Sequence, residues 1–168
     1  MVNNFLNTQK KSIMKTDEKA MNPVEAMSIE ERNKNLIRRS TEEIYNKGNY
    51  ADIDKVVSSG FIIHSLNPER EIRGAEGAKN FVRALRTAFP DLKFTITDQF
   101  AEGEKVVTHY IVEGTHKGLF EGIPPTGKSF KVSAIDIDYI TNGKVSECWS
   151  NLDELSLLRQ LGVLSKPF

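Results

Sequence analysis

The sequence predicts an α+β fold in which helices come first along the chain and an antiparallel sheet follows. Three observations predict it. Apolar residues recur at helical spacing in the first half of the chain. From residue 92 onward, apolar and polar residues alternate with a period of two, as in half-buried strands. Asn142-Gly143 separates two such runs, and this dipeptide is a strong short-range signal for a β-hairpin.

The helical half is expected to begin at Ser28. Ser28 followed by Glu31 fits a capping box, which satisfies free amide groups at the start of a helix. Apolar residues then continue at near-helical spacing up to Gly48, which predicts the end of this helix. A shorter second helix is expected over residues 50–57.

A third helix is expected from Gly74, after a short strand at 61–64 that is closed by a turn at Asn67-Pro68. It should end just before Pro90, because the residue preceding a proline is pushed out of the helical conformation. The strands of the second half are expected at residues 92–96, 106–113, 130–141 and 144–151, with a closing helix at 154–161.

The length of 168 residues fits one domain. Residues 1–27 are polar and lack sustained periodicity, so we expect a flexible N-terminal extension there and a single domain over residues 28–168.

Composition excludes several classes of function. Lys plus Arg and Asp plus Glu both number 23, so no net charge favours a nucleic-acid or anionic-lipid partner. Cys148 is the only cysteine, which rules out an intrachain disulfide and a thiolate metal cluster. No segment has the apolar length of a membrane span or the pattern of a secretory signal, so a cytoplasmic location is the default expectation.

The hairpin predicts which side chains share a face of the sheet. A two-residue turn pairs Thr141 with Lys144, and counting outward sets Asp138 opposite Glu147. One face would then carry Asp136, Asp138, Glu147, Trp149, Ala134, Asn151, Val132 and Asp153. The other face would carry Ile135, Ile137, Tyr139, Cys148 and Leu152.

Two interpretations of the acidic face remain open. It could be the wall of a pocket in which carboxyl pKa values are raised for acid/base chemistry. It could equally be a solvated outer face with Ile135 and Ile137 turned to the core, and the pattern alone slightly favours this second interpretation.

Ordered motifs along the chain resemble one known family. From Gly114 the chain reads GTHKGLFEGIPPTGKSF and then DIDYITNGKVSECWSNLDELSLLRQLG; upstream it reads FPDLKFTITDQFAEGEKVV and FIIHSLNPEREIRG. This series, from about Arg32 to Gly162, resembles the SnoaL-like polyketide (ester) cyclases. The resemblance implies an NTF2-like conical barrel, a curved antiparallel sheet wrapped around the N-terminal helices. It also implies acid/base chemistry without metal or cofactor.

The resemblance assigns three candidate catalytic residues. The W-x-x-x-D motif gives Asp153 the acid/base role in an aldol ring closure, although Asp153 could instead cap the closing helix. Asp136 holds the position that presents a carboxyl to an oxyanion in ketosteroid isomerases, with a structural ion pair as the alternative. His64 ends the first strand and could serve as a general base.

Five further side chains are substrate-binding candidates: Trp149, Asp138, Phe120, His109 and His116. Trp149 could equally be a core residue, His109 is more typical of a satisfied structural histidine, and His116 of one that orders its loop. The three histidines are far apart, so we expect no metal site. Asp138 departs from the family, which usually carries an apolar or aromatic residue there, and this favours a smaller or more polar ligand.

Two hypotheses about function follow. The first is a cofactor-independent cyclase or isomerase that acts on a small carbonyl compound through an enolate. In it Asp153 or His64 is the base, Asp136 donates to the oxyanion and Trp149 forms a wall. The second is a non-catalytic ligand-binding or dimerisation module. In either case we expect a homodimer or higher homo-oligomer, with Ile135, Ile137, Tyr139 and Cys148 offering the contact surface.

Overall fold

A computed structural model describes residues 27–64 and 71–164. Nearly all of the predicted N-terminal extension, and the turn expected at Asn67-Pro68, lie outside these residues. The described elements are α2 (Ile29–Ser40), η1 (Thr41–Asn46), η2 (Tyr50–Asp52), α3 (Ile53–Val56), β1 (Val57–His64), β2 (Ile72–Arg73), α4 (Gly74–Ala88), β3 (Lys93–Glu102), β4 (Lys105–Thr115), β5 (Ser129–Thr141), β6 (Lys144–Leu152) and α5 (Glu154–Gln160).

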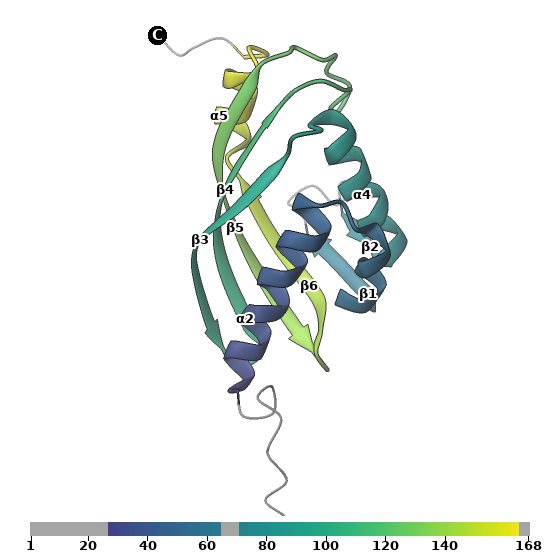
Figure 1. The fold of residues 1–168 in the computed structure, drawn as a ribbon, viewed down its shortest axis with the longest axis vertical. Helices are drawn as coiled ribbons and strands as arrows, with labels where there is room; N and C mark the ends of the chain where they lie inside the picture. The colour runs from purple at the N-terminus through teal and green to yellow at the C-terminus, as the bar shows by residue number, and fades with distance from the viewer. Residues whose placement is uncertain (1–26, 65–70, 165–168) are drawn as a thin grey trace, which may run out of the picture.

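One six-stranded sheet in the order β2-β1-β6-β5-β4-β3 curves around the helices α2 and α4 (Figure 1). Strands β3 to β6 form the predicted antiparallel meander. The sheet is mixed, however, because β1 pairs in parallel with β6, and His64 lies beside Trp149. This pairing joins segments far apart in sequence, and no local pattern predicts it.

The first helix begins as predicted, with the Ser28 hydroxyl accepting a hydrogen bond from the Glu31 amide at 3.2 Å. It does not continue unchanged to Gly48. After Ser40 the chain enters η1, a π-helical turn in which the Lys47 amide donates to the Glu42 carbonyl at 3.0 Å. A π turn accommodates one more residue than an α turn and is often found at functional sites.

The hairpin turn is confirmed, but the predicted register beyond it is wrong. Asn142 and Gly143 both have positive φ, 53° and 73°, and Thr141 pairs with Lys144. Ser146 is then an extra residue, and its hydroxyl donates to the Tyr139 carbonyl at 3.1 Å. This β-bulge shifts the pairing by one residue, so that Asp138 lies opposite Cys148.

The bulge exchanges the faces of β6. Cys148, expected outside, is buried on the inner face, whereas Glu147 and Trp149, expected beside the aspartates, lie on the outer face. Strand β5 keeps its expected alternation, with Asp136 and Asp138 inside and Ile135 and Ile137 outside. The predicted juxtaposition of Asp138 with Glu147 is therefore absent.

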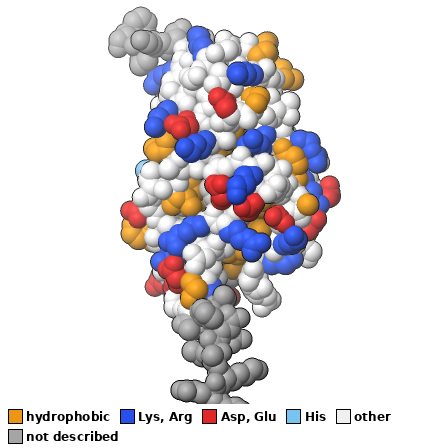
Figure 2. Space-filling model, in the orientation of Figure 1, with side chains coloured by type: hydrophobic (Ala, Val, Ile, Leu, Met, Phe, Trp, Pro, Cys, Tyr) orange, Lys and Arg blue, Asp and Glu red, His pale blue; other side chains and the backbone are white. Residues whose placement is uncertain are grey.

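Two apolar clusters form the core. One lies between α2, η1, α3, α4 and the inner faces of β1, β5 and β6; the second gathers around Phe89 between the end of α4, strands β3 to β5 and α5. None of the helices in the described ranges is long and apolar enough to cross a membrane. Acidic and basic side chains are interspersed over the face shown in Figure 2, where no single sign of charge dominates.

Candidate active site

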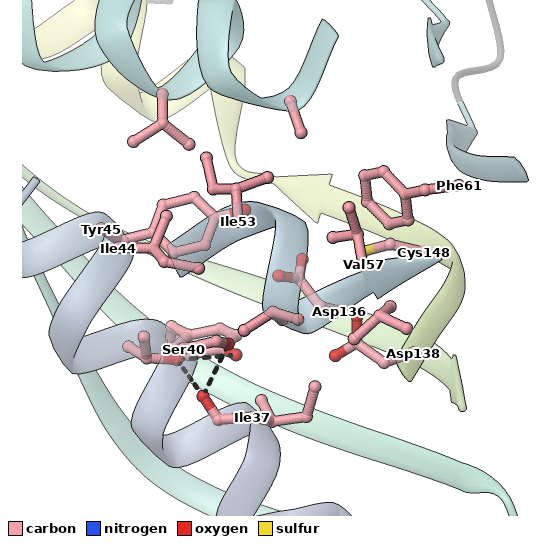
Figure 3. A pocket seen from close by; sticks show the side chains of 16 residues that line it. Ile37, Ser40, Ile44, Tyr45, Ile53, Val57, Phe61, Asp136, Asp138 and Cys148 are labelled. Atoms are coloured by element: carbon pink, nitrogen blue, oxygen red, sulfur yellow. Dashed lines mark hydrogen bonds between the residues drawn. The ribbon is translucent and has the colours of Figure 1, made fainter. Parts of the chain in front are cut away.

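A pocket in the first apolar cluster is the candidate site (Figure 3). Its helical wall comes from α2, η1, α3 and α4, and its strand wall from β1, β4, β5 and β6. The residues that line it are Ile37, Ser40, Thr41, Ile44, Tyr45, Ile53, Val56, Val57, Phe61, Ala78, Val82, Tyr110, Asp136, Asp138, Val145 and Cys148. The cavity is small, about 50 Å³, so any substrate larger than a few atoms must displace side chains of these walls.

Asp136 and Asp138 bring two carboxyl groups into this pocket from β5. They are two residues apart on one strand, so both point to the inner face. Asp138 is only 6 % exposed, and the Asp136 Oδ1 atom is buried without a hydrogen-bond partner among the described residues. The structure thus brings together two of the sequence-predicted site residues.

Burial raises the pKa of both carboxyl groups, because the charged forms lose water that the apolar walls do not replace. Burial raises the pKa of Asp136 to about 6, against a smaller lowering effect from the Ser150 hydroxyl. For Asp138, burial and the nearby Asp136 raise the pKa to about 8. Near neutral pH the pair therefore holds about one proton, with one carboxylate and one carboxylic acid in the same pocket.

Tyrosine hydroxyls complete the polar part of the pocket. Tyr45 enters from the helical wall, opposite Asp136 and Asp138 (Figure 3). The Tyr110 hydroxyl lies 3.5 Å from the Thr41 hydroxyl. Burial raises the pKa of Tyr45 and of Tyr110 well above the ordinary value, with added repulsion from the aspartates, so both stay neutral donors. Within the described part of the chain, no Lys, Arg or His lines the pocket.

The structure places His64 and Trp149 outside this pocket. Their rings stack at 4.2 Å between centroids on the outer face of the sheet, and Trp149 is 45 % exposed. The His64 Nε2 atom lies 2.7 Å from Glu147 Oε2, and Nδ1 lies 3.6 Å from Glu71 Oε1. Trp149 therefore does not line this pocket, and a substrate wall formed by Trp149 stays a prediction. The base role given to His64 would require the substrate to lie on the outer face.

Asp153 lies at the start of α5 and is exposed. Its carboxylate accepts a hydrogen bond from the Ser156 amide at 3.0 Å. Hydrogen bonds from Ser156 hold the pKa of Asp153 below its ordinary value. Asp153 therefore caps helix α5, which is the alternative to a catalytic role that the sequence left open. It does not line the pocket.

The remaining predicted substrate ligands are also elsewhere. His109 faces outward from β4, with its Nδ1 atom 2.7 Å from the Thr97 hydroxyl. His116 and Phe120 pack against Phe89 in the second cluster. His116 is fully buried, and its Nδ1 atom accepts a hydrogen bond from the Thr126 amide at 3.3 Å. These contacts fit the alternative interpretation, in which His116 orders its loop.

Sequence reasoning missed Tyr45, Tyr110 and Cys148 as pocket residues. The alternation of β4, in which Val106, Thr108 and Tyr110 share the inner face, carried a signal for Tyr110. Cys148 was predicted on the outer face, because the predicted register did not include the bulge at Ser146. Along residues 27–64 and 71–164, no group of three or more His, Cys, Asp or Glu side chains is arranged to hold a metal ion.

Comparison with known proteins identifies the family. The family model of the SnoaL-like polyketide cyclases matches residues 35–161. The chain is 32 % identical to aklanonic acid methyl ester cyclase DauD from Streptomyces sp. (strain C5), over 76 % of this chain and 80 % of that protein. It is 30 % identical to aklanonic acid methyl ester cyclase DnrD from Streptomyces peucetius, over 76 % of this chain and 88 % of that protein.

A solved structure agrees with these sequence relatives. TsrD from Streptomyces laurentii superposes with a TM-score of 0.72 at 32 % identity, over 80 % of this chain and 97 % of that chain. The predicted α+β barrel, a curved sheet around N-terminal helices, is thereby confirmed. The chain belongs to the SnoaL-like polyketide cyclase family.

Proposed function

We propose that this protein is a cofactor-independent acid/base enzyme that converts a small carbonyl compound through an enolate, as a cyclase or isomerase. The observation that carries the proposal is the pair Asp136 and Asp138, buried together in a pocket whose other walls are largely apolar. A site that must remove and return a proton near neutral pH needs one charged and one neutral group, and this pair holds about one proton there.

The deeper burial of Asp138, which is 6 % exposed whereas Asp136 is partly exposed, favours Asp138 as the protonated acid and Asp136 as the base. The Asp136 carboxylate takes the proton from the carbon next to the carbonyl, and the electron pair of that C–H bond moves to form the enolate. The neutral Asp138 donates a hydrogen bond to the enolate oxygen. In a ring closure, the enolate carbon then bonds to a second carbonyl carbon, and the new alkoxide takes a proton from the acid group. In an isomerisation, the proton returns to another carbon.

The charge of the pocket favours an uncharged substrate. Among the described residues, two carboxyl groups and no cationic side chain line it, so a substrate carboxylate would be repelled by these walls. The two curated cyclases are named for a methyl ester, in which the carboxyl charge is absent. We propose a neutral ester or ketone for this chain as well.

Solvent deuterium exchange tests the proposal, because enolisation exchanges the C–H hydrogen even if ring closure is blocked. We expect the protein to catalyse exchange into a panel of β-keto esters, and Asp136→Asn or Asp138→Asn to lower the rate by about 100-fold or more. Asp153→Asn is the matched control, because it removes an exposed carboxylate of the same chain and should leave exchange unchanged. Exchange no faster than in buffer across the panel, or equal rates in all three variants, would contradict the proposal.

We further propose that the outer face of the sheet pairs with a second copy of the chain. Phe100, Val107, Ile137 and Trp149 form one cross-strand row over β3, β4, β5 and β6. Three of them are exposed, Phe100 by 64 %, Ile137 by 37 % and Trp149 by 45 %. An apolar row across four strands is the type of surface that homodimers bury.

The expected cytoplasmic location stays a prediction.

A further inference from the structure

The π-helical turn η1, which follows α2, forms part of the pocket wall, and the carboxyl pair does not account for it. Three of its residues, Thr41, Ile44 and Tyr45, line the pocket. On a regular α-helix, Asn46 would lie about half a turn around from the buried Ile37, on the side away from the core. The wider turn brings Asn46 to strand β3 instead, where it makes two hydrogen bonds.

Asn46 binds the edge of the sheet as a strand would. Its amide nitrogen donates to the Phe94 carbonyl at 3.0 Å, and its amide oxygen accepts from the Phe94 N–H at 2.8 Å. Since β3 is the last of the described strands in the sheet, these backbone groups point away from its neighbour β4. We call this pair of bonds the Asn46 clamp.

Arg86 on α4 reinforces the same turn. Its Nη1 atom donates to the carbonyl oxygens of Tyr45 and Asn46, both at 2.8 Å. These are carbonyls at the C-terminal end of a helical segment, which have no partner within that segment. The turn is therefore fixed to a strand on one side and to a helix on the other.

The clamp also sets the ring of Tyr45. Phe94, the residue that Asn46 holds, packs against Tyr45 with ring centroids 4.9 Å apart and against Tyr110 at 5.7 Å. The Tyr45 side chain then extends into the pocket opposite the carboxyl pair (Figure 3). Burial and the fields of Cys148, Asp136 and Asp138 keep the pKa of its hydroxyl high, so Tyr45 offers a neutral donor at any working pH.

We propose that Tyr45 donates a hydrogen bond to the substrate oxygen and that Asn46 is the positioning residue that holds Tyr45 in place. This inference rests on the proposed function. The described walls of the pocket carry no cation, so they must stabilise a developing oxyanion with neutral donors, and Tyr45 supplies one from the wall opposite Asp138. The rate of the reaction depends on the position of this donor to within about 1 Å, so the contact that fixes the turn of Tyr45 affects catalysis.

Kinetics of the exchange reaction test both residues. Tyr45→Phe should lower kcat by about 100-fold with little change in KM. Asn46→Ala should lower kcat by about 10-fold. Asn46→Asp, which keeps the acceptor for the Phe94 N–H, should lie between Asn46→Ala and the parent. The double variant should be no slower than Tyr45→Phe alone, because Asn46 acts through Tyr45. Additive losses would overturn the positioning role.

Two matched controls separate this role from general stability. Tyr50→Phe removes a tyrosine hydroxyl that is near the same turn but does not line the pocket. Asn49→Ala removes an amide that donates to Glu43 at 2.7 Å rather than to the sheet. Both should retain the parent kcat. If either control loses as much as the corresponding variant, the proposal fails.

A second measurement does not depend on turnover. In protein labelled with ¹³C at the tyrosine Cζ atoms, NMR follows the ring carbon next to each hydroxyl, and Tyr45→Phe assigns the Tyr45 resonance by its loss. A β-keto ester with two methyl groups on the carbon between its carbonyls cannot lose a proton there, so it can be added to saturation without turnover at that carbon. It should shift the Tyr45 resonance, because the hydroxyl then donates to the bound carbonyl oxygen. Asn46→Ala should reduce this shift and Tyr50→Phe should not. A Tyr45 resonance that stays in place at saturation would overturn the inference, even if Asp138→Asn abolishes exchange. Absence of exchange in the parent would contradict only the proposed function.

Discussion

At the scale of single residues, burial of Asp136 and Asp138 in the pocket lowers the stability of the folded protein when these carboxyl groups are charged. Their surroundings are Ile, Val and Phe side chains with a few hydroxyls, which favour the protonated forms. Such a pair does not stabilise the fold at neutral pH. Its presence at the centre of the core is therefore better explained by function than by stability.

The raised pKa values predict how stability depends on pH. In the unfolded chain both carboxyls ionise near the ordinary value of 3.8, whereas in the folded protein they hold their protons to about pH 6 and 8. Unfolding therefore releases protons in this window, and the free energy of unfolding should fall as pH rises from about 4 to about 8. Asp138→Asn should flatten this fall and be more stable than the parent at pH 8 by about 2 kcal/mol.

Urea unfolding followed by circular dichroism between pH 5 and pH 9 measures this dependence. Asp153→Asn is the control, because the pKa of Asp153 is lowered and its titration falls below the window. It should keep the slope of the parent. A parent protein whose stability stays constant or rises across the window would show that the pair is not buried in the protonated state.

At the scale of elements, the hairpin of β5 and β6 shows how much a sequence pattern can predict. The turn at Asn142-Gly143 was predictable because two consecutive positive φ angles favour that dipeptide. The bulge at Ser146 has no such signal, since an extra serine in a strand looks like any other polar position. A single inserted residue reverses every later side chain, and this moved Cys148 into the pocket and Trp149 out of it.

The aspartates were predicted on one shared face because they lie on β5, which the bulge does not interrupt. Tyr45 could not be paired with them from sequence, since it lies about ninety residues away on a helical turn. The same holds for the parallel pairing of β1 with β6. Contacts between distant segments depend on how the sheet curves, which local periodicity does not encode.

Helix α5 gives a prediction that separates the two interpretations of Asp153. Asp153→Ala removes the N-cap bond to the Ser156 amide and should destabilise the protein by about 1 kcal/mol. Asp153→Asn should keep most of this stability, because asparagine is also a good N-cap. Thermal unfolding measures both. Deuterium exchange should match the parent in each variant, and a folded Asp153→Ala protein without exchange would restore the catalytic role that the family motif implies.

At the scale of the whole molecule, the curved sheet divides the chemistry between its two faces. The inner face carries the acid/base pocket under the helices, whereas the outer face carries the row Phe100, Val107, Ile137 and Trp149. Trp149 is paired across the ladder with Ile137 and stacks on His64, so the row extends to β1. The bulge that places Cys148 inside is the same feature that adds Trp149 to this outer row.

This row predicts the oligomeric state. If two copies pair through it, a charge in its centre would face the same charge of the partner in an apolar contact, which costs several kcal/mol. Ile137→Glu combined with Trp149→Glu should therefore convert the dimer to a monomer at micromolar concentration, as measured by sedimentation equilibrium. Leu119→Glu is the control, because Leu119 is 66 % exposed but lies in the loop after β4, away from the row. The double variant should remain folded and keep its exchange activity, since neither residue lines the pocket. A parent protein that sediments as a monomer up to 100 µM, or a double variant that still dimerises, would contradict pairing through this face.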